Sequence, residues 1–220
     1  MTGDYTKCIR FWDEVFSSEQ GSPPKRAATG NKGFDQALQW LCRDGSSLLD
    51  FGCGNGACLL ICALLGIREG MGIDLSEAAV REGLRRAEEM GAHTFRFLYG
   101  GVERLSSLPE DSMDAILLSN ILDNLYPDDG LALLEQARRI LRPQGKLLVK
   151  IGPYLTEDQI QAWDIQVIEG DLLDDGLLLW NQTTQAWEEL LSRYFPVVRQ
   201  ETIYYAEHEQ ENRLFFLMKQ

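Results

Sequence analysis

The segment DFGCGNG, residues 50–56, contains the residue types best suited to holding a charged ligand. Its glycines Gly52, Gly54 and Gly56 predict a turn whose bare backbone can approach a ligand closely. The same glycines fit the G-x-G-x-x-G/A motif of dinucleotide-binding enzymes, so by themselves they leave the type of cofactor open. Asp50 separates the two interpretations, because a carboxylate just before the turn would repel a pyrophosphate and attract a ligand with an ammonium group.

A second carboxylate, Asp74 in the segment GIDLS, is placed to bind a sugar. It ends an expected strand, where a carboxylate can accept hydrogen bonds from both hydroxyls of a ribose. The position fits any nucleoside cofactor, and it also fits a strand-end residue that merely precedes a helix.

Alternating strands and helices must position these carboxylates. We expect strands at 47–51, 71–74, 94–99, 113–120 and 145–151, and helices between them at 57–65, 76–90 and 128–142, the last one stopped by Pro143. This alternation predicts a parallel sheet with right-handed crossovers, in which ligands bind at the carboxyl ends of the strands. Around this core we expect an amphipathic helix at 4–17, a linker at 17–30, a helix at 33–42, and a C-terminal helix followed by two strands.

Four segments resemble, in order, motifs of the class I S-adenosylmethionine-dependent methyltransferases. They are LLDFGCGNG, GIDLS, LPEDSMDAILLSNILDNL and LRPQGKLLVK, which lie between residues 48 and 151. The resemblance implies an α/β, doubly wound, mostly parallel seven-stranded sheet of order 3-2-1-4-5-7-6, with strand 7 antiparallel and helices on both faces. It also implies S-adenosylmethionine as cofactor and methyl transfer as activity.

Carried over by position, the resemblance assigns the methionine and ribose parts of the cofactor. Gly52, Gly54 and Asn55 would lie along the methionine, with Asp50 beneath its amino group. Asp74 would hold the ribose.

The same resemblance assigns the adenine and the sulfonium. Leu75 would contact the adenine, while Ser119 and Asn120 would lie beside the sulfonium. The family often has an acidic residue near the adenine after the third strand, and this chain has Gly101 there. We therefore expect the backbone of Gly101 and Val102, or the side chain of Glu103, to replace it.

The sequence identifies no catalytic residue. His93 and His208 are the only histidines, and neither is expected near the site. A sulfonium is already a good leaving group, so alignment and desolvation can supply much of the catalysis. The family motif N/D-P-P-Y/F, found in methyltransferases that act on planar nitrogens, is absent after the fourth strand.

The composition of the chain indicates which classes of binding partner are not expected. The formal net charge is −13, with 21 Lys and Arg against 34 Asp and Glu, so no nucleic-acid partner is expected. The longest basic cluster, Arg85-Arg86, lies on a helix where we expect solvated arginines and an inward Leu84. Cys53, Cys58 and Cys62 lack a nearby histidine, so we expect no metal site. The absence of a long apolar stretch predicts no membrane association and a cytoplasmic protein.

These observations favour a small-molecule acceptor. A protein methyltransferase, a non-catalytic S-adenosylmethionine-binding module and a nicotinamide-dependent reductase remain as alternatives, the reductase being the poorest fit to Asp50.

The domain organisation follows from the same patterns. One domain, 1–220, would comprise an N-terminal lid helix and linker (1–32), a cofactor-binding core (33–151), a cap insertion (152–182) and C-terminal elements (183–220). The cap is expected to contain a hairpin around Asp174–Gly176 and to enclose the acceptor. The expected acceptor contacts are aromatic: Tyr126, Tyr154, Trp163 and Trp180.

Overall fold

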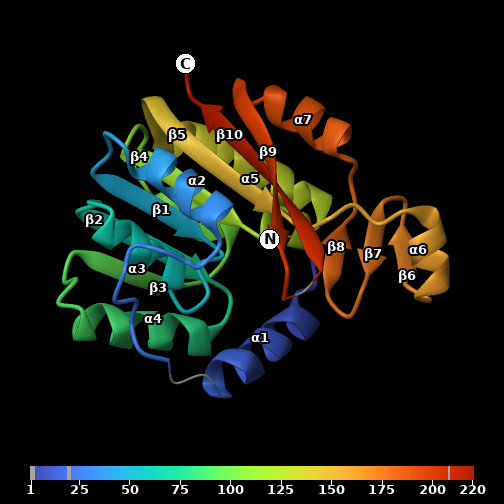
Figure 1. Ribbon diagram of the computed structural model, residues 1–220, viewed down its shortest axis with the longest axis horizontal. Helices are drawn as coiled ribbons and strands as arrows, with labels where there is room; N and C mark the ends of the chain where they lie inside the picture. Colours follow the sequence, from blue (N-terminus) through green and yellow to red (C-terminus); the bar gives the residue numbers. More distant parts are fainter. Residues whose placement is uncertain (1–2, 19–20, 208) are drawn as a thin grey trace.

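The computed structural model describes residues 3–18, 21–207 and 209–220. Its centre is a seven-stranded sheet of order β3-β2-β1-β4-β5-β10-β9 (Figure 1). The strands are β1 (Ser47–Phe51), β2 (Glu69–Asp74), β3 (Phe95–Tyr99), β4 (Met113–Ser119), β5 (Leu141–Ile151), β9 (Val197–Tyr205) and β10 (Gln210–Met218). β10 is antiparallel to both neighbours and the first five strands are parallel. This is the expected order 3-2-1-4-5-7-6, with β9 and β10 as the sixth and seventh strands.

Helices cover both faces of the sheet, as expected. The helices α2 (Lys32–Cys42), α3 (Ala57–Leu64) and α4 (Glu77–Glu89) pack on one face. The opposite face is covered by η1 (Val102–Ser107), α5 (Pro127–Ile140) and α7 (Thr184–Ser192), with η2 (Leu122–Asn124) at its edge. Every residue of β1 is buried because it lies between these layers, and so it delivers Asp50 into a dry interior.

The helix α5 ends earlier than the sequence suggests. Pro143 was expected to stop it after Arg142, but the helix ends at Ile140 and Leu141 is already extended. Leu141 is fully buried and pairs with Met113, which begins β5 before the proline is reached. The burial of Leu141 in the sheet therefore sets the end of α5. Pro143 adds to this effect, because a proline disfavours the helical conformation of the residue before it.

The insertion forms a cap with a sheet of its own. It comprises α6 (Glu157–Ala162), β6 (Gln166–Glu169), β7 (Leu172–Asp174) and β8 (Leu178–Trp180). The expected hairpin joins β7 to β8, and β6 adds a third strand at the outer edge. Figure 1 shows this cap projecting from the right of the main sheet.

Two expectations about α4 are wrong. Leu84 is 47% exposed, whereas Arg86 is buried and paired with the buried Glu82. Once this pair occupies the inner side of the helix, Leu84 is left on the outer side. The N-terminal helix α1 (Thr6–Ser18) packs against α4 at the bottom of Figure 1.

Candidate functional site

A cavity of about 220 Å³ lies at the carboxyl ends of β1, β2 and β4. The lining includes six residues expected at the cofactor: Gly52, Gly54, Asp74, Leu75, Ser119 and Asn120. Tyr5, Trp12 and Phe16, from the segment expected to form a lid, also line the cavity. The remaining lining residues were not assigned from the sequence: Cys8, Ile9, Phe51, Ile73, Ser76, Gly100, Ile121, Asn124, Leu125 and Leu177. The cavity occupies the place where open α/β sheets bind ligands.

Asp50 lies near the end of β1, just before the glycine turn, and does not line the cavity. Only 1% of the residue is exposed, and neither carboxylate oxygen has a hydrogen-bond partner in the described part of the chain. Burial, together with the charge of Asp74, raises the pKa of Asp50 to about 8. A buried carboxylate without a partner is costly, and a cationic ligand group would remove that cost.

Asp74 ties the second strand to the glycine turn. One carboxylate oxygen accepts a hydrogen bond from the amide of Gly54 at 2.8 Å, and the other accepts one from the amide of Ser76 at 2.8 Å. Burial raises the pKa of Asp74, although these backbone hydrogen bonds lower it. Since each carboxylate oxygen has two lone pairs, both retain acceptor capacity toward the cavity.

Two glycines of the turn, Gly52 and Gly54, leave space that side chains would fill, and we call this pair the glycine cradle. Gly52 and Gly54 have φ values of +73° and +52°, in the left-handed region that favours glycine. A Cβ atom on Gly52 would lie 2.7 Å from Cγ1 of Ile121, and one on Gly54 would lie 3.0 Å from Cζ of Phe16. Asn55 does not line the cavity; its side-chain oxygen accepts a hydrogen bond from the amide of Ala57 at 3.3 Å.

The turn after β3 lines the cavity with one residue. Gly100 lines the cavity, whereas Gly101 and Val102 do not. The amide of Gly101 donates to the Glu103 carboxylate at 2.8 Å, and Val102 begins η1 with its side chain in the core. Glu103 is thereby held at its own turn.

The end of β4 forms a constrained polar turn. Asn120 has φ +54°, its amide donates to the carbonyl of Lys150 at 2.7 Å, and its side-chain oxygen accepts from Asn212 at 3.2 Å. The Nδ2 of Asn124 donates to the carbonyl of Asn120 and to the carboxylate of Asp123. Asn120 and Asn124 thus bring fixed polar groups to an otherwise apolar wall.

One face of α1 lines the cavity, through four residues at helical spacing: Cys8, Ile9, Trp12 and Phe16. Tyr5, just before the helix, lines it as well. The rings of Trp12 and Phe16 stack with centroids 5.6 Å apart. Their periodicity was visible in the sequence and marks the face that points to the site.

Polar contacts attach α1 to the rest of the molecule at each end. Asp13 accepts hydrogen bonds from Oγ of Ser76 at 2.6 Å and from the amide of Ala78 at 3.1 Å, so it caps α4 directly beside Asp74. The Tyr5 hydroxyl donates to Asp129 at 2.9 Å, and Lys7 pairs with Asp174 of the cap at 2.6 Å.

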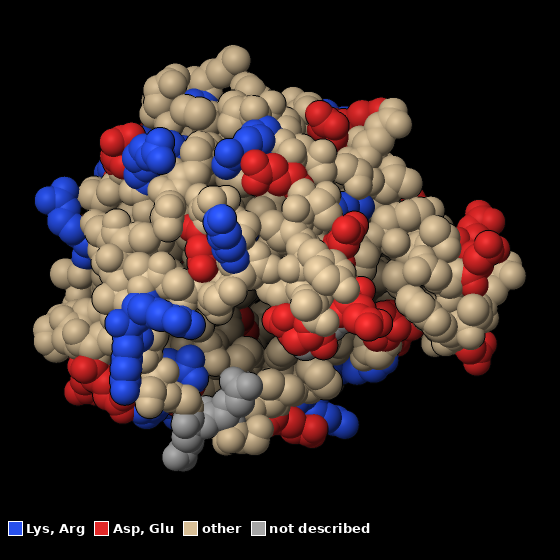
Figure 2. All heavy atoms as spheres, in the orientation of Figure 1, with Lys and Arg blue, Asp and Glu red and all other residues tan. Residues whose placement is uncertain are grey.

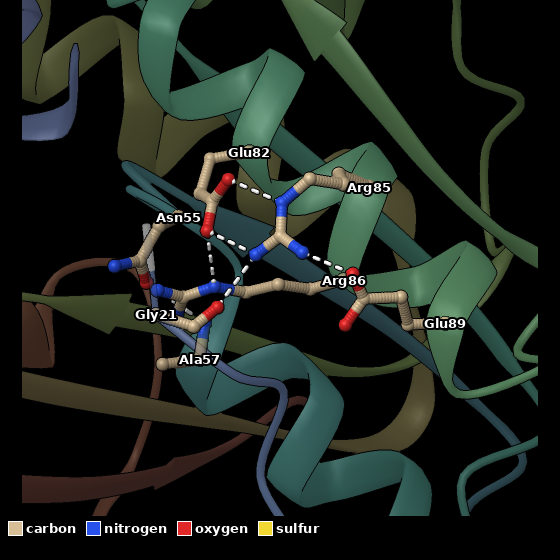
Figure 3. Close-up of polar contacts among 7 residues, drawn as sticks. All are labelled: Gly21, Asn55, Ala57, Glu82, Arg85, Arg86 and Glu89. Atoms are coloured by element: carbon tan, nitrogen blue, oxygen red, sulfur yellow. Dashed lines mark hydrogen bonds and ion pairs between the residues drawn. The ribbon is translucent and has the colours of Figure 1, made fainter. Parts of the chain in front are cut away.

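The linker after α1 is also held by α4. Figure 3 shows Arg85 joining three groups: the carboxylates of Glu82 and Glu89 and the carbonyl oxygen of Gly21. Hydrogen bonds from Arg85 are the main cause that lowers the pKa of Glu82, to about 2. Arg85 therefore attaches the linker to α4 at Gly21, and Arg86 is not the solvated residue that the sequence suggested.

The four aromatic residues expected at the acceptor do not line the cavity. Tyr154 and Trp163 are exposed. Trp180 is buried against Trp187, with ring centroids 4.8 Å apart, and Tyr126 packs edge-on against Tyr5. The cap reaches the cavity instead through Leu177, at the tip of its hairpin.

The described residues hold no group of three or more His, Cys, Asp or Glu side chains that could bind a metal. No helix in the described ranges is long and apolar enough to cross a bilayer. His93 is exposed, and His208 lies outside the described residues.

Comparisons with known proteins agree with this geometry. Residues 48–145 match the family model of a methyltransferase domain. A ribosomal protein L11 methyltransferase of Neisseria meningitidis is 36% identical over 90 residues, which are 40% of this chain and 28% of that protein. The chain therefore spans little more than a quarter of the length of this relative.

Solved structures resemble the chain over almost its whole length. The 1,6-didemethyltoxoflavin-N1-methyltransferase of Burkholderia thailandensis, with bound 1,6-didemethyltoxoflavin and S-adenosylhomocysteine, has a TM-score of 0.71 and 19% identity, covering 100% of this chain and 91% of that one. The [4+2]-cyclase SpnF has a TM-score of 0.67 and 16% identity, covering 98% and 94%. At these identities the likeness shows the fold alone.

The strand order and the cavity at the carboxyl ends of the strands are those of a Rossmann-like fold. Within that fold, residues 48–145 are similar to a methyltransferase domain.

Proposed function

We propose that this protein binds S-adenosylmethionine in the cavity beneath α1 and transfers its methyl group to an acceptor. The observation that carries the proposal is Asp50, a buried carboxylate without a protein partner just before the glycine cradle. An ammonium group is the chemical complement of that carboxylate, whereas a pyrophosphate is not. The alternative nicotinamide cofactor is therefore disfavoured.

In this proposal, different residues around the cavity contact different parts of the cofactor. Asp50 supports the amino group of the methionine, Gly52 and Gly54 leave room for its backbone, and Asp74 accepts hydrogen bonds from the ribose hydroxyls. Leu75 and Gly100 border the adenine. Ser119 and Asn120 border the reacting end. Asn55, Gly101 and Val102 support these contacts from beside the cavity.

The bound cofactor supplies an electrophilic methyl group on a sulfonium. The chain contributes alignment and exclusion of water, because Tyr5, Ile9 and Trp12 cover the cavity with apolar surface. The fixed amides of Asn120 and Asn124 provide polar contacts that can orient a nucleophile. No general base is needed when that nucleophile is unprotonated at the working pH.

A small molecule is the acceptor that we propose first. The cavity is enclosed by α1 and by Leu177 of the cap, a geometry that suits a compact acceptor better than a folded chain. The solved neighbour with a bound small molecule aligns over the entire chain, including the cap. Cytoplasmic localisation is part of the same proposal.

A protein acceptor is the second candidate. The curated relatives act, by their names, on a ribosomal protein, but the aligned 90 residues are 40% of this chain, so much of the acceptor side can differ.

Turnover is the direct test. The protein is incubated with S-adenosylmethionine and a metabolite extract or a protein extract, and formation of S-adenosylhomocysteine is followed by mass spectrometry. Extract-dependent product that is lost in Asp50→Asn and Asp74→Ala supports the proposal. Binding of S-adenosylhomocysteine without turnover in either extract would favour a non-catalytic binding module.

A further inference from the structure

The outer edge of the cap exposes apolar side chains on an unpaired strand. β6 is the edge strand of the small sheet and hydrogen bonds to β7 alone. All four of its residues are exposed, with Val167 at 53% and Ile168 at 44%. Because consecutive residues of a strand point to opposite faces, both faces of β6 are uncovered.

Two large aromatic side chains extend this surface. Trp163, between α6 and β6, is 59% exposed, and Tyr154, before α6, is 39% exposed. We name Tyr154, Trp163, Val167 and Ile168 the cap edge. Natural sheets usually blunt an edge strand with lysine, proline or a covering element. No lysine or proline lies in β6, and its four side chains are uncovered, while the strand is protected only by its short length, by Glu169 and by a register shift against β7.

The charges around the cap edge are of one sign. Residues 152–182 contain no Lys, Arg or His, and they include seven acidic residues: Glu157, Asp158, Asp164, Glu169, Asp171, Asp174 and Asp175. Asp174 pairs with Lys7, and no ion pair involves the other six within the described chain. Figure 2 shows acidic groups at the outer margin of this lobe.

We propose that the cap edge docks an extended, Lys- or Arg-rich segment of a partner protein, which adds to β6 as a fourth strand. Backbone hydrogen bonds to β6 would supply the affinity, and the alternating exposed side chains would supply the selection of apolar and basic residues. The surrounding carboxylates complement a basic segment. A second copy of this chain would bring the same seven acidic residues against them, and like charges across strands are unfavourable.

The proposal is independent of the cofactor and of the methyl acceptor. It needs only that β6 and its surroundings are folded. Docking at this edge would place a partner on the same cap whose hairpin tip, Leu177, lines the cavity.

Fluorescence anisotropy with labelled ten-residue peptides tests the proposal. The probe alternates lysine and valine. One control alternates glutamate and valine, and a second has the same number of lysines separated by glycine and serine. At 0.15 M salt we expect the lysine–valine peptide to bind at least ten-fold more tightly than either control. Equal binding of the glycine–serine control would show that the peptide is held only by non-specific charge attraction, and would overturn the proposal.

Matched substitutions locate the site. Val167→Lys should weaken peptide binding at least ten-fold, whereas Val198→Lys, on the exposed edge strand β9 of the main sheet, should change it less than two-fold. Val198 is 50% exposed, so the two variants match in exposure and in added charge. Thermal unfolding and calorimetry with S-adenosylhomocysteine check that both variants retain the fold and the cofactor site.

Two further outcomes contradict the proposal. Equal loss of peptide binding in Val167→Lys and Val198→Lys would place the peptide elsewhere. A wild-type dimer in sedimentation that Val167→Lys dissociates would make a second copy the occupant. A protein that binds the peptide but not S-adenosylhomocysteine would refute the proposed function and leave the docking surface intact.

Discussion

At the scale of single residues, the proposed function depends on a carboxylate that is buried without a protein partner. Burial and the charge of Asp74 raise the pKa of Asp50 to about 8, which favours its protonated form near neutral pH. A bound ammonium group favours the ionised form and lowers that pKa. Binding of the cofactor must therefore release a proton from Asp50.

This linkage gives the first prediction. Affinity for S-adenosylhomocysteine should rise as the pH rises from 6 to 7.5, because less free energy is spent on removing the proton. Calorimetry at pH 7 in buffers of different ionisation enthalpy measures the number of protons released on binding. We expect the wild type to release more protons than Asp50→Asn. Affinity independent of pH over this range would contradict the assignment of Asp50 to the ammonium group.

The glycine cradle and the ribose carboxylate give the second prediction. Gly52→Val should abolish measurable binding, because its side chain would fill the cradle and its backbone has a positive φ. Asp74→Ala should weaken binding by roughly 1.5–3 kcal/mol, the value of hydrogen bonds to a charged group.

The chain offers a matched control for the glycine. Gly66 also has a positive φ, of +108°, but no atom lies within 4 Å of a Cβ placed there. Gly66→Val should carry the same kind of backbone strain and leave the affinity unchanged. Wild-type affinity in a folded Gly52→Val protein would show that the site is elsewhere.

At the scale of elements, we propose that α1 acts as a lid that is held in place by the hydrogen bonds of Asp13. The cavity of about 220 Å³ is smaller than usual ligand pockets, which are roughly 300–1,000 Å³, so entry of a nucleoside cofactor requires α1 to move. Asp13 caps α4 next to Asp74, and this contact couples the position of the lid to the cofactor site.

Trypsin measures this coupling at Lys25 and Arg26, in the linker after α1. Cleavage should slow when S-adenosylhomocysteine adds contacts to Trp12 and Phe16. It should accelerate in Asp13→Ala, which loses the two hydrogen bonds that attach α1 to the start of α4. Glu14→Ala, an exposed neighbour on the same helix, is the control. Cleavage unaffected by both the ligand and Asp13→Ala would remove the reason for a lid.

The sequence predicted the elements whose periodicity or motifs are local. The strand order that the resemblance implied is confirmed. The assignment of Asp50 and Asp74 to the cofactor stays a prediction, and Asp74 lines the cavity. The outward Leu84 could not be predicted, because the inner side of α4 is taken by the buried Glu82–Arg86 pair, which depends on tertiary packing. The burial of Trp180 against Trp187 could not be predicted, because an aromatic residue in an insertion has the same sequence signal whether it faces a ligand or the core.

At the scale of the whole molecule, the cap is continuous with the core and also presents a surface of its own. Leu172, Leu178 and Trp180 belong to the same buried cluster as Trp187 and Phe195. Removing the cap would therefore strip part of the core, so point variants such as Val167→Lys are better tests of its role than truncation. Seven acidic residues of the cap contribute to the net charge of −13. The proposed docking surface is therefore acidic, in contrast to the largely apolar cavity.

The central claim is that the cavity takes S-adenosylmethionine in preference to a nicotinamide cofactor. Isothermal titration calorimetry of the wild-type protein with S-adenosylhomocysteine and, separately, with NADH tests it most directly. We predict saturable one-to-one binding of S-adenosylhomocysteine that Asp74→Ala weakens at least ten-fold, and no measurable heat with NADH. Saturable binding of NADH, with no binding of S-adenosylhomocysteine by the folded protein, would contradict the assignment of Asp50, the glycine cradle and Asp74.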